Sequence, residues 1–248
     1  MIEIVNLHKS FGRQQVLRGV NLTIPHGQIT AIIGRSGSGK SVLLKHLVAL
    51  IRPDSGQVLV DGEELGRLRG KALDQVREKF GVLFQGGALF DSMTVFDNVA
   101  FPLREKTRLP EAEIAKRANQ RLEAVGLADI GKKYPAEVSG GMKKRVALAR
   151  ALVQDPKIIL FDEPTTGLDP ILLNSIHRLI FDAHKSFGFT AVVISHEIPE
   201  IFDIAQTVAM LHEGVIVEHG SPELIMASAN PVVRQFITGA SDGPIHSK

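Results

Sequence analysis

A glycine-rich loop between an apolar run and a helix-like run constrains this chain more than any other feature. The run ITAII at 29–33 leads directly into GRSGSGKS at 34–41, and the apolar residues of SVLLKHLVAL at 41–50 recur with helical spacing. Glycines let the backbone curl closely around phosphate oxygens, and a helix N-terminus carries about half an elementary positive charge. The pattern therefore predicts a strand–loop–helix unit that holds nucleotide phosphates.

The positions of this loop have distinct expected roles. Lys40 is expected to reach the β- and γ-phosphates, and the Ser41 hydroxyl to bind Mg²⁺. An ordinary glycine turn is the alternative, and the strand before the loop and the helix after it argue against that alternative. The other residues expected to contact the phosphates are Gly34, Arg35, Ser36, Gly37, Ser38 and Gly39.

A second apolar run, IILF, delivers two adjacent carboxylates, Asp162 and Glu163. A buried strand would bring them to the edge of the sheet where the phosphate loop lies. Asp162 is then placed to hold Mg²⁺, and Glu163 to polarise an attacking water. Alone, such a pair would be a helix cap or a solvated turn, but the phosphate loop upstream favours catalysis.

Composition limits the other possibilities. The formal charge is +2, from 29 basic and 27 acidic residues, so the chain lacks the basic footprint of a nucleic-acid binder. The absence of cysteine excludes disulfides and thiolate sites. No run approaches the roughly 18 apolar residues that span a bilayer. We therefore expect a soluble protein that reaches a membrane only through a partner, and no nucleic-acid partner.

In the rest of the chain, segments with strand-like patterns are interrupted once, by a stretch with helical patterns. Branched residues at 2–7 and 16–24 predict strands, whereas EAEIAKRANQRLEAVGL, which begins at Glu111, has helical period. Pro222 and Pro231 are expected to start two short helices. His177 and His184 share a predicted helix face and are expected to be solvated.

The order of these motifs resembles the ATP-binding subunits of ABC transporters over about residues 1–225. The motifs are Phe11, GRSGSGKS, Gln85, VSGGM, ILFDEP, TGLD and ISHE. The resemblance implies an α/β fold: a P-loop NTPase core with a mostly parallel sheet, an N-terminal antiparallel β subdomain and an inserted helical lobe. The expected boundaries within the single domain are 1–86 and 151–225 for the core, 87–150 for the lobe and 226–248 for a C-terminal extension.

The resemblance also implies ATP and Mg²⁺ as cofactors and a site completed by a second copy of the chain. Ser139, Gly140 and Gly141 would clamp the γ-phosphate that the opposite subunit holds; Ser139 could equally be a plain helix cap. Of the remaining family positions, Phe11 would stack on adenine and Gln85 would sense Mg²⁺ and link the site to a permease. Asp169 would cross the dimer interface, and His196 would contact the γ-phosphate.

Two further segments resemble the ATPases of Mla- and Mce-type phospholipid transport systems: GGALFDSMTVFDNVAFPLRE at 86–105 and VRQFITGASDGP at 233–244. Met142, where ABC proteins usually have glutamine, fits the same group. This resemblance implies a homodimeric ATPase that works with a transmembrane permease and an Mce-class lipid-binding protein. It would lie on the cytoplasmic face of the inner membrane, held there by the permease.

Two alternatives remain open at this stage: an importer ATPase for a small solute, and a soluble ABC ATPase that acts as a scaffold. A DNA-repair head is disfavoured, because no heptad run lies between Lys40 and Ser139. The apolar cluster Leu89, Phe90, Met93, Val95 and Phe96 is expected to pack the lobe in part and to form a permease groove with the rest; burial of the whole cluster is the alternative.

Overall fold

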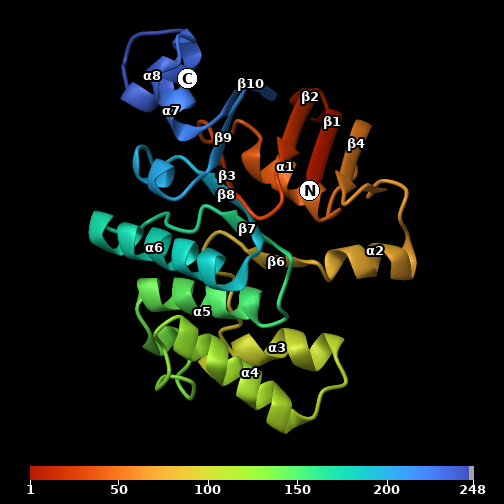
Figure 1. The fold of residues 1–248 in the computed structure, drawn as a ribbon, viewed down its shortest axis with the longest axis vertical. Coiled ribbons are helices and arrows are strands. Elements are labelled where there is room, and N and C mark those ends of the chain that lie inside the picture. The colour runs from red at the N-terminus through yellow and green to blue at the C-terminus, as the bar shows by residue number, and fades with distance from the viewer. Residues whose placement is uncertain (246–248) are drawn as a thin grey trace. The chain divides into compact units, whose positions relative to one another are not determined.

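The computed structural model describes residues 1–245, and Figure 1 follows the elements along the chain. Their contacts divide the chain into two compact units. One contains Met1–Glu78 together with the segment from Thr190 onward, and the other contains Lys79–Phe189. The last three residues of the expected C-terminal extension lie outside the described residues.

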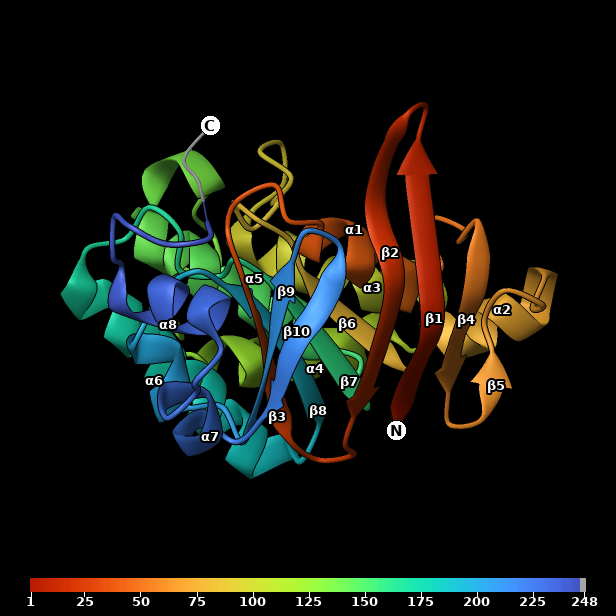
Figure 2. The ribbon, with the colours of Figure 1, turned by 90° about the horizontal axis from the view of Figure 1, so that it is seen from above.

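The first unit begins with an antiparallel sheet, as expected for the N-terminal region. Its strands are β1 (Ile2–Phe11), β2 (Gln14–Ile24), β4 (Ser55–Val60) and β5 (Glu63–Glu64), in the order β2-β1-β4-β5. Figure 2 shows β1 and β2 as a long hairpin with β4 beside β1. Ile2, Ile4 and Leu7 of β1 are buried, so the branched residues that predicted the strand also anchor it in the core.

The same unit contains the strand that enters the glycine-rich loop. β3 (Ile29–Ile33) pairs in parallel with β8 (Thr190–Ser195) and β9 (Thr207–His212), and β10 (Val215–Gly220) returns antiparallel to β9. All five residues of β3 are buried, which explains its continuous apolar run. The helices of this unit are α1 (Lys40–Leu47), α2 (Gly70–Arg77), α7 (Pro222–Met226) and α8 (Pro231–Thr238), with a short 3₁₀ turn η2 (Glu200–Asp203). The two predicted proline starts are confirmed.

The second unit combines two strands with a group of helices. β6 (Phe80–Leu83) and β7 (Ile158–Asp162) pair in parallel. The helices are α3 (Val95–Lys106), α4 (Glu111–Ala124), α5 (Gly140–Leu152) and α6 (Pro170–Phe187), with a 3₁₀ turn η1 (Pro135–Glu137). α3 packs against both α4 and α5, and α5 also packs on α6 (Figure 1). The predicted helix start at Glu111 is confirmed, because α4 begins there with Pro110 at its N-cap.

The expectation that His177 and His184 are solvated is not met. His177 is buried on the inner face of α6, not solvated, because that face also carries Leu173, Ile176 and Ile180. His184 is half-buried and meets the ring of Phe189 edge-on at 5.5 Å.

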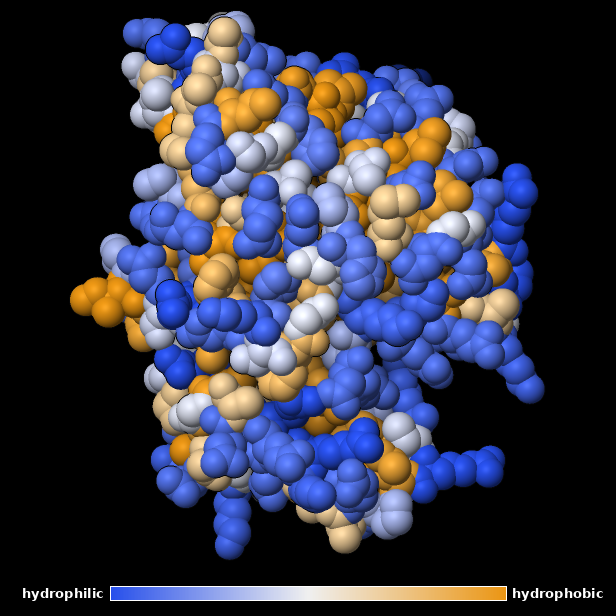
Figure 3. All heavy atoms as spheres, viewed as in Figure 1, coloured by the Kyte–Doolittle hydropathy of each residue, from blue (hydrophilic) through white to orange (hydrophobic). Residues whose placement is uncertain are grey.

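The sequence pattern left β4, β5, α2 and β6 without a prediction. Within residues 1–245 no helix is both long and apolar enough to cross a bilayer; Figure 3 shows hydrophilic residues over most of one face, with hydrophobic patches among them.

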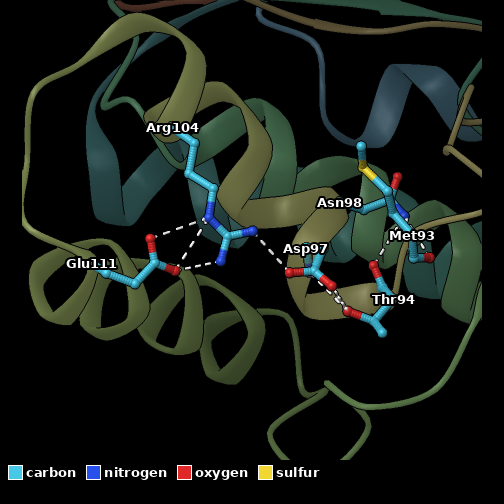
Figure 4. A network of polar contacts seen from close by, with 6 residues as sticks. All are labelled: Met93, Thr94, Asp97, Asn98, Arg104 and Glu111. Atoms are coloured by element: carbon cyan, nitrogen blue, oxygen red, sulfur yellow. Dashed lines mark hydrogen bonds and ion pairs between the residues drawn. The ribbon is translucent and has the colours of Figure 1, made fainter.

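A polar network joins α3 to the start of α4 (Figure 4). Arg104 on α3 contacts Asp97 on one side and Glu111 on the other. Its Nη1 donates to Asp97 Oδ1 at 2.8 Å, and its Nε donates to Glu111 Oε1 at 3.2 Å. Thr94 caps α3 by accepting from the Asp97 N–H at 3.1 Å. The hydrogen bonds from Arg104 and then from Thr94 lower the pKa of Asp97. The network therefore fixes where α3 begins and how α4 departs.

Asn98 on α3 holds the preceding loop from a buried position. Its amide nitrogen donates to the carbonyls of Phe90, Met93 and Thr94 at 3.0, 3.2 and 3.0 Å. Its oxygen accepts from the Phe90 N–H at 2.8 Å. One side chain, with 0% exposure, thus satisfies four backbone groups of segment 90–94.

We expect Asn98→Ala to lower the free energy of unfolding by about 2–3 kcal/mol, because it removes the hydrogen bonds of a buried side chain, including those to the Phe90 N–H and the Met93 carbonyl. Arg104→Met is the matched control: its ion pairs are half exposed, so their loss should cost about 1 kcal/mol or less. Urea unfolding of both variants checks the difference. Equal losses would show that Asn98 does not hold the loop.

Candidate nucleotide-binding site

The glycine-rich loop of the first unit is shaped by close contact with a neighbouring strand. Gly34, directly after β3, has φ 148°, and a Cβ there would lie 2.2 Å from the carbonyl oxygen of Leu211 on β9. Any larger residue would push the loop off the strand. Arg35, Ser36 and Gly37 are exposed, so the loop presents its backbone to solvent. A glycine-rich loop between a strand and a helix N-terminus is the arrangement that binds phosphate oxygens through backbone N–H groups.

The side chains at the end of the loop are also suited to binding phosphate. Lys40, the first residue of α1, is 4% exposed, and its amine donates to the carbonyls of Gly34 and Arg35 at 2.7 and 2.9 Å. A buried ammonium at the mouth of the loop suits an anionic ligand. The Ser38 hydroxyl is buried and has no hydrogen-bond partner among the described residues. Ser41 follows on α1 and is half-buried. A triphosphate with its Mg²⁺ fits this donor set.

Parallel strand pairing places His196 next to the loop. In the register of β3 and β8, Ile33 lies opposite Ser195. Gly34 and His196 are the next residues along these two strands, so both leave the sheet at the same edge. His196 is exposed there. The structure thus brings together the phosphate loop and the histidine that the sequence predicted to contact the γ-phosphate.

Phe11 lies at the tip of the β1–β2 hairpin, opposite Gln14. Its side chain is 50% exposed, so the ring is accessible for stacking and does not belong to the core. The phosphate loop approaches the same hairpin, since a Cβ on Gly39 would lie 3.1 Å from the Val16 carbonyl oxygen. Gln14 and Val16 are two residues apart on β2, which is about 7 Å of strand. Phe11 is therefore within reach of a nucleotide whose phosphates occupy the loop.

The second unit gathers the predicted acidic residues. In the register of β6 and β7, Leu83 lies opposite Phe161, so Gln85 and the acidic pair leave these strands at one edge. Asp162 is 8% exposed. The Gln85 amide donates to Glu163 Oε2 at 3.1 Å, and the Thr166 hydroxyl donates to the same oxygen at 3.1 Å. The oxygens of Asp162 and Gln85 are ligands of the kind that Mg²⁺ prefers.

Glu163 is held in an unusual backbone conformation, with φ 48°. For a residue other than glycine this costs on the order of 1–2 kcal/mol, and such conformations concentrate at functional sites. Thr166 is a contributor that the sequence did not single out. Its signal was its place three residues after Glu163 in a tight turn. Together Gln85 and Thr166 fix one oxygen of the Glu163 carboxylate, and this carboxylate can orient a water.

The VSGGM segment of the second unit forms an exposed helix N-terminus. Ser139 is the N-cap of α5, and its hydroxyl accepts from the Met142 N–H at 3.3 Å. Ser139 and Gly140 are exposed, and Gly141 is buried against Leu172. The helix-cap interpretation of Ser139 is therefore correct. The free N–H groups of the first turn also suit an anion, so the cap does not exclude the phosphate role.

Asp169 caps the next helix. Its Oδ1 accepts from the N–H groups of Ile171 and Leu172 at 3.0 and 3.1 Å. Ile171 is 82% exposed and Leu172 is 40% exposed. The structure therefore places Asp169 at a helix N-cap beside exposed apolar residues; its predicted role at a dimer interface stays a prediction.

A groove of about 490 Å³ opens in the second unit beside the segment that follows Gln85. Phe84, Phe90, Phe101 and Arg150 are among its lining residues. Arg150 on α5 donates to the carbonyls of Gly87 and Ala88 at 2.7 and 2.8 Å, and burial lowers its pKa. Of the predicted apolar cluster Val95 is buried, Phe90 is 42% exposed, and Leu89, Met93 and Phe96 are half-buried. Of this cluster, Phe90 thus lines the groove and Val95 packs in the core; the expected permease contact stays a prediction.

Comparison with known proteins gives the family. The family described as "ABC transporter" matches residues 17–166. The chain belongs to the ABC transporter family. It is similar to the Escherichia coli strain K12 protein named "Intermembrane phospholipid transport system ATP-binding protein MlaF", with 43% identity over 99% of this chain and 91% of that protein. It is also similar to the Mycobacterium tuberculosis strain H37Rv protein named "Probable ribonucleotide transport ATP-binding protein mkl", with 45% identity over 98% of this chain and 68% of that protein.

Solved structures give the same fold. The ATP-binding cassette MJ0796, in a dimeric post-hydrolysis state bound to ADP and Pi, matches 90% of this chain and 99% of its own, with 33% identity and a TM-score of 0.81. CbiO1 from Clostridium perfringens, part of the ABC transporter complex cbiONQ, matches 92% of this chain and 90% of its own, with 33% identity and a TM-score of 0.84. The chain described here is therefore an ATPase of the ABC transporter family. The predicted fold class, α/β with a P-loop NTPase core, is confirmed.

We expect Gly34→Ala to lower the free energy of unfolding by about 2–3 kcal/mol, because its Cβ meets the Leu211 carbonyl. Gly37→Ala is the control within the same loop: φ is 78°, but no atom lies within 4 Å of the added Cβ, so the cost should be about 1 kcal/mol. Chemical denaturation measures both. A larger loss for Gly37→Ala would contradict the assigned contact.

Proposed function

We propose that this chain is the ATP-hydrolysing subunit of an ABC transporter that moves phospholipids between membranes. The observation that carries the proposal is its likeness to the Escherichia coli phospholipid-transport ATPase along nearly the whole length of both chains. The segments 86–105 and 233–244, which suggested the same group, support it. The transporter would place this subunit on the cytoplasmic face of the inner membrane.

MgATP would bind through the phosphate loop. The backbone N–H groups of residues 34–41 would hold the phosphates, Lys40 would leave its carbonyl partners for the β- and γ-phosphates, and Phe11 would stack on adenine. Mg²⁺, when bound, neutralises charge on the phosphate oxygens; Ser41, Asp162 and Gln85 would hold it. Membership in the family supports this assignment, together with the donors found in each unit.

Hydrolysis would depend on the Glu163 carboxylate. Gln85 and Thr166 orient the carboxylate through hydrogen bonds to its Oε2, and the carboxylate so oriented would accept a hydrogen bond from the attacking water. His196 would donate to the γ-phosphate as negative charge develops there. Catalysis would then be mostly positioning and electrostatic stabilisation, as expected for phosphoryl transfer.

A second copy of the chain would complete each site. The exposed N-terminus of α5, with Ser139, Gly140 and Gly141, would clamp the γ-phosphate held by the opposite copy. The dimeric state of the similar MJ0796 cassette supports this arrangement. Asp169, next to the exposed Ile171, would lie at the interface between the copies.

The permease would dock in the groove that Phe84, Phe90 and Phe101 line. The exposed rings of Phe84 and Phe90 suit an amphipathic helix, and the lining residues Phe84 and Ala88 flank Gln85 in the chain. Movement of Gln85 on hydrolysis would thus reach the permease through one short segment. An Mce-class lipid-binding protein would belong to the same complex.

Ribonucleotide transport is a second candidate, because the mycobacterial relative is named a probable ribonucleotide transport ATP-binding protein. The present chain covers a smaller share of those proteins than of the phospholipid-transport ATPase. Purification of the complete transporter from detergent-solubilised membranes, followed by lipid and nucleotide analysis, separates the two. Co-purified phospholipid supports our proposal. Bound ribonucleotide other than ATP or ADP, or no permease at all, would overturn it.

We expect Glu163→Gln to leave ATP binding within about twofold of the parent and to lower turnover by at least about 100-fold, since one oriented carboxylate contributes on that scale. The variant should accumulate as a nucleotide-bound dimer, measured by size-exclusion chromatography with and without ATP. Near-normal turnover would show that Glu163 is not the water-orienting group.

We expect Ser139→Arg to abolish hydrolysis and leave ATP binding by the monomer largely intact, because the new side chain fills the phosphate clamp of the opposite copy and not the phosphate loop. Calorimetric titration with ATP and an ATPase assay give the two readings. Loss of binding equal to the loss of turnover would contradict a site shared between copies.

A further inference from the structure

The tip of strand β1 extends past the end of its neighbour β4. The pairing between these strands runs from Ile2 opposite Val60 to His8 opposite Ser55, and Ser55 is the first residue of β4. Residues 9–11 of β1, including Phe11, continue beyond that point. The register with β2 also shifts between Lys9 and Ser10. Beyond His8, β1 is therefore paired along β2 and no longer along β4.

Asp54, the residue before β4, contacts this tip through both backbone and side chain. Its N–H donates to the His8 carbonyl at 2.9 Å. Its Oδ1 accepts from Lys9 Nζ at 2.8 Å, and its Oδ2 accepts from the Ser10 N–H at 2.6 Å. The hydrogen bonds from Lys9 and then Ser10 lower the pKa of Asp54. The carboxylate thus takes the place of the next β4 residue in holding β1.

Lys9 passes this constraint on to the aromatic ring. Its ammonium lies over the Phe11 ring, 5.5 Å from the centroid, which is within range of a cation–π contact. The Lys9 side chain is 17% exposed, whereas Phe11 is 50% exposed. One face of the ring is therefore covered by a cation that Asp54 holds, and the ring remains accessible to a base.

The segment that carries Asp54 also carries the phosphate-binding lysine. Lys40 begins α1, α1 ends at Leu47, and the chain then leads to Asp54. Burial holds α1 in place through Leu43, Leu44 and Leu47. One packed segment thus has the phosphate loop at its start and the anchor of the Phe11 hairpin after its end.

We propose that Asp54, acting through Lys9 and the Ser10 N–H, is a positioning residue that sets the Phe11 ring for the adenine base. The inference rests on the proposed function, in which Phe11 stacks on ATP. It assigns a role to a residue outside the loops that bind phosphate and Mg²⁺. The role concerns the base alone, so its loss should weaken recognition of adenine and not of the phosphates.

Titrations of the full chain with MgATP and with magnesium tripolyphosphate, which has the phosphates but no base, test this inference. We expect Asp54→Ala to raise the dissociation constant for ATP about three- to tenfold, in the range of cation–π and base-stacking contacts, and to leave that for tripolyphosphate within about twofold. Asp54→Asn keeps an acceptor for the Ser10 N–H and loses the charge that holds Lys9, so it should raise the dissociation constant for ATP less than Asp54→Ala does. Lys9→Met, which removes the same ion pair, should raise that constant to the same extent as Asp54→Asn.

Arg67→Met is the matched control, because it removes another ion pair of the same unit, Arg67 Nε to Glu64 Oε2 at 2.7 Å. It should change neither dissociation constant. Equal weakening of ATP and tripolyphosphate by Asp54→Ala would overturn the inference, since it would indicate general disruption of the site. An unchanged ATP constant would also overturn it.

Phe11→Ala separates this inference from the proposed function. If Phe11→Ala weakens ATP and Asp54→Ala adds nothing in that background, Asp54 acts through Phe11. If Phe11→Ala weakens ATP and Asp54→Ala alone does not, the positioning role is wrong and the stacking role stands. If Phe11→Ala leaves ATP unchanged, the stacking role itself is wrong.

Discussion

Parallel pairing of neighbouring strands is the constraint on which the candidate site depends. Because Ile33 lies opposite Ser195, the phosphate loop and His196 must leave the sheet at one edge. The same rule applies in the second unit, where Leu83 lies opposite Phe161 and the segments after them carry Gln85 and Glu163. In parallel sheets the carboxyl ends of the strands collect the ligand-binding residues. The same geometric rule thus operates in both units: in the first it gathers the residues proposed to bind phosphate, and in the second those proposed to hold Mg²⁺ and the attacking water.

In the proposed site, anions would be held mainly by backbone N–H groups and not by many charged side chains. The loop 34–41 and the N-terminus of α5 both offer N–H groups to solvent, and Gly34 is close to Leu211 because no side chain intervenes. Ligand charge, rather than the net charge of the protein, then governs recognition. This explains how a chain with a net charge of only +2 can bind a triphosphate.

Sequence alone predicted the parts of the site that are local. The strand–loop–helix at 29–50 and the cap at Ser139 depend on residues that are adjacent in the chain, so their patterns suffice. The contact of Glu163 with Gln85 and Thr166 could not be predicted, because it depends on β6, a strand of four residues whose apolar run is too short to separate from a helix. Burial of His177 was mispredicted for a related reason: helical spacing shows which residues share a face but not which way the face points.

A cross-linking measurement tests the shared site most directly. The chain has no cysteine, so Ser36→Cys and Ser139→Cys each introduce a single thiol, and both positions are exposed. The two variants would be mixed and treated with a short bismaleimide, with and without Mg²⁺ and a non-hydrolysable ATP analogue. The account predicts a cross-linked pair of chains that forms with nucleotide, that requires both variants and that is absent from either variant alone. Cross-linking that is absent, or equal with and without nucleotide, would contradict a site built from two copies.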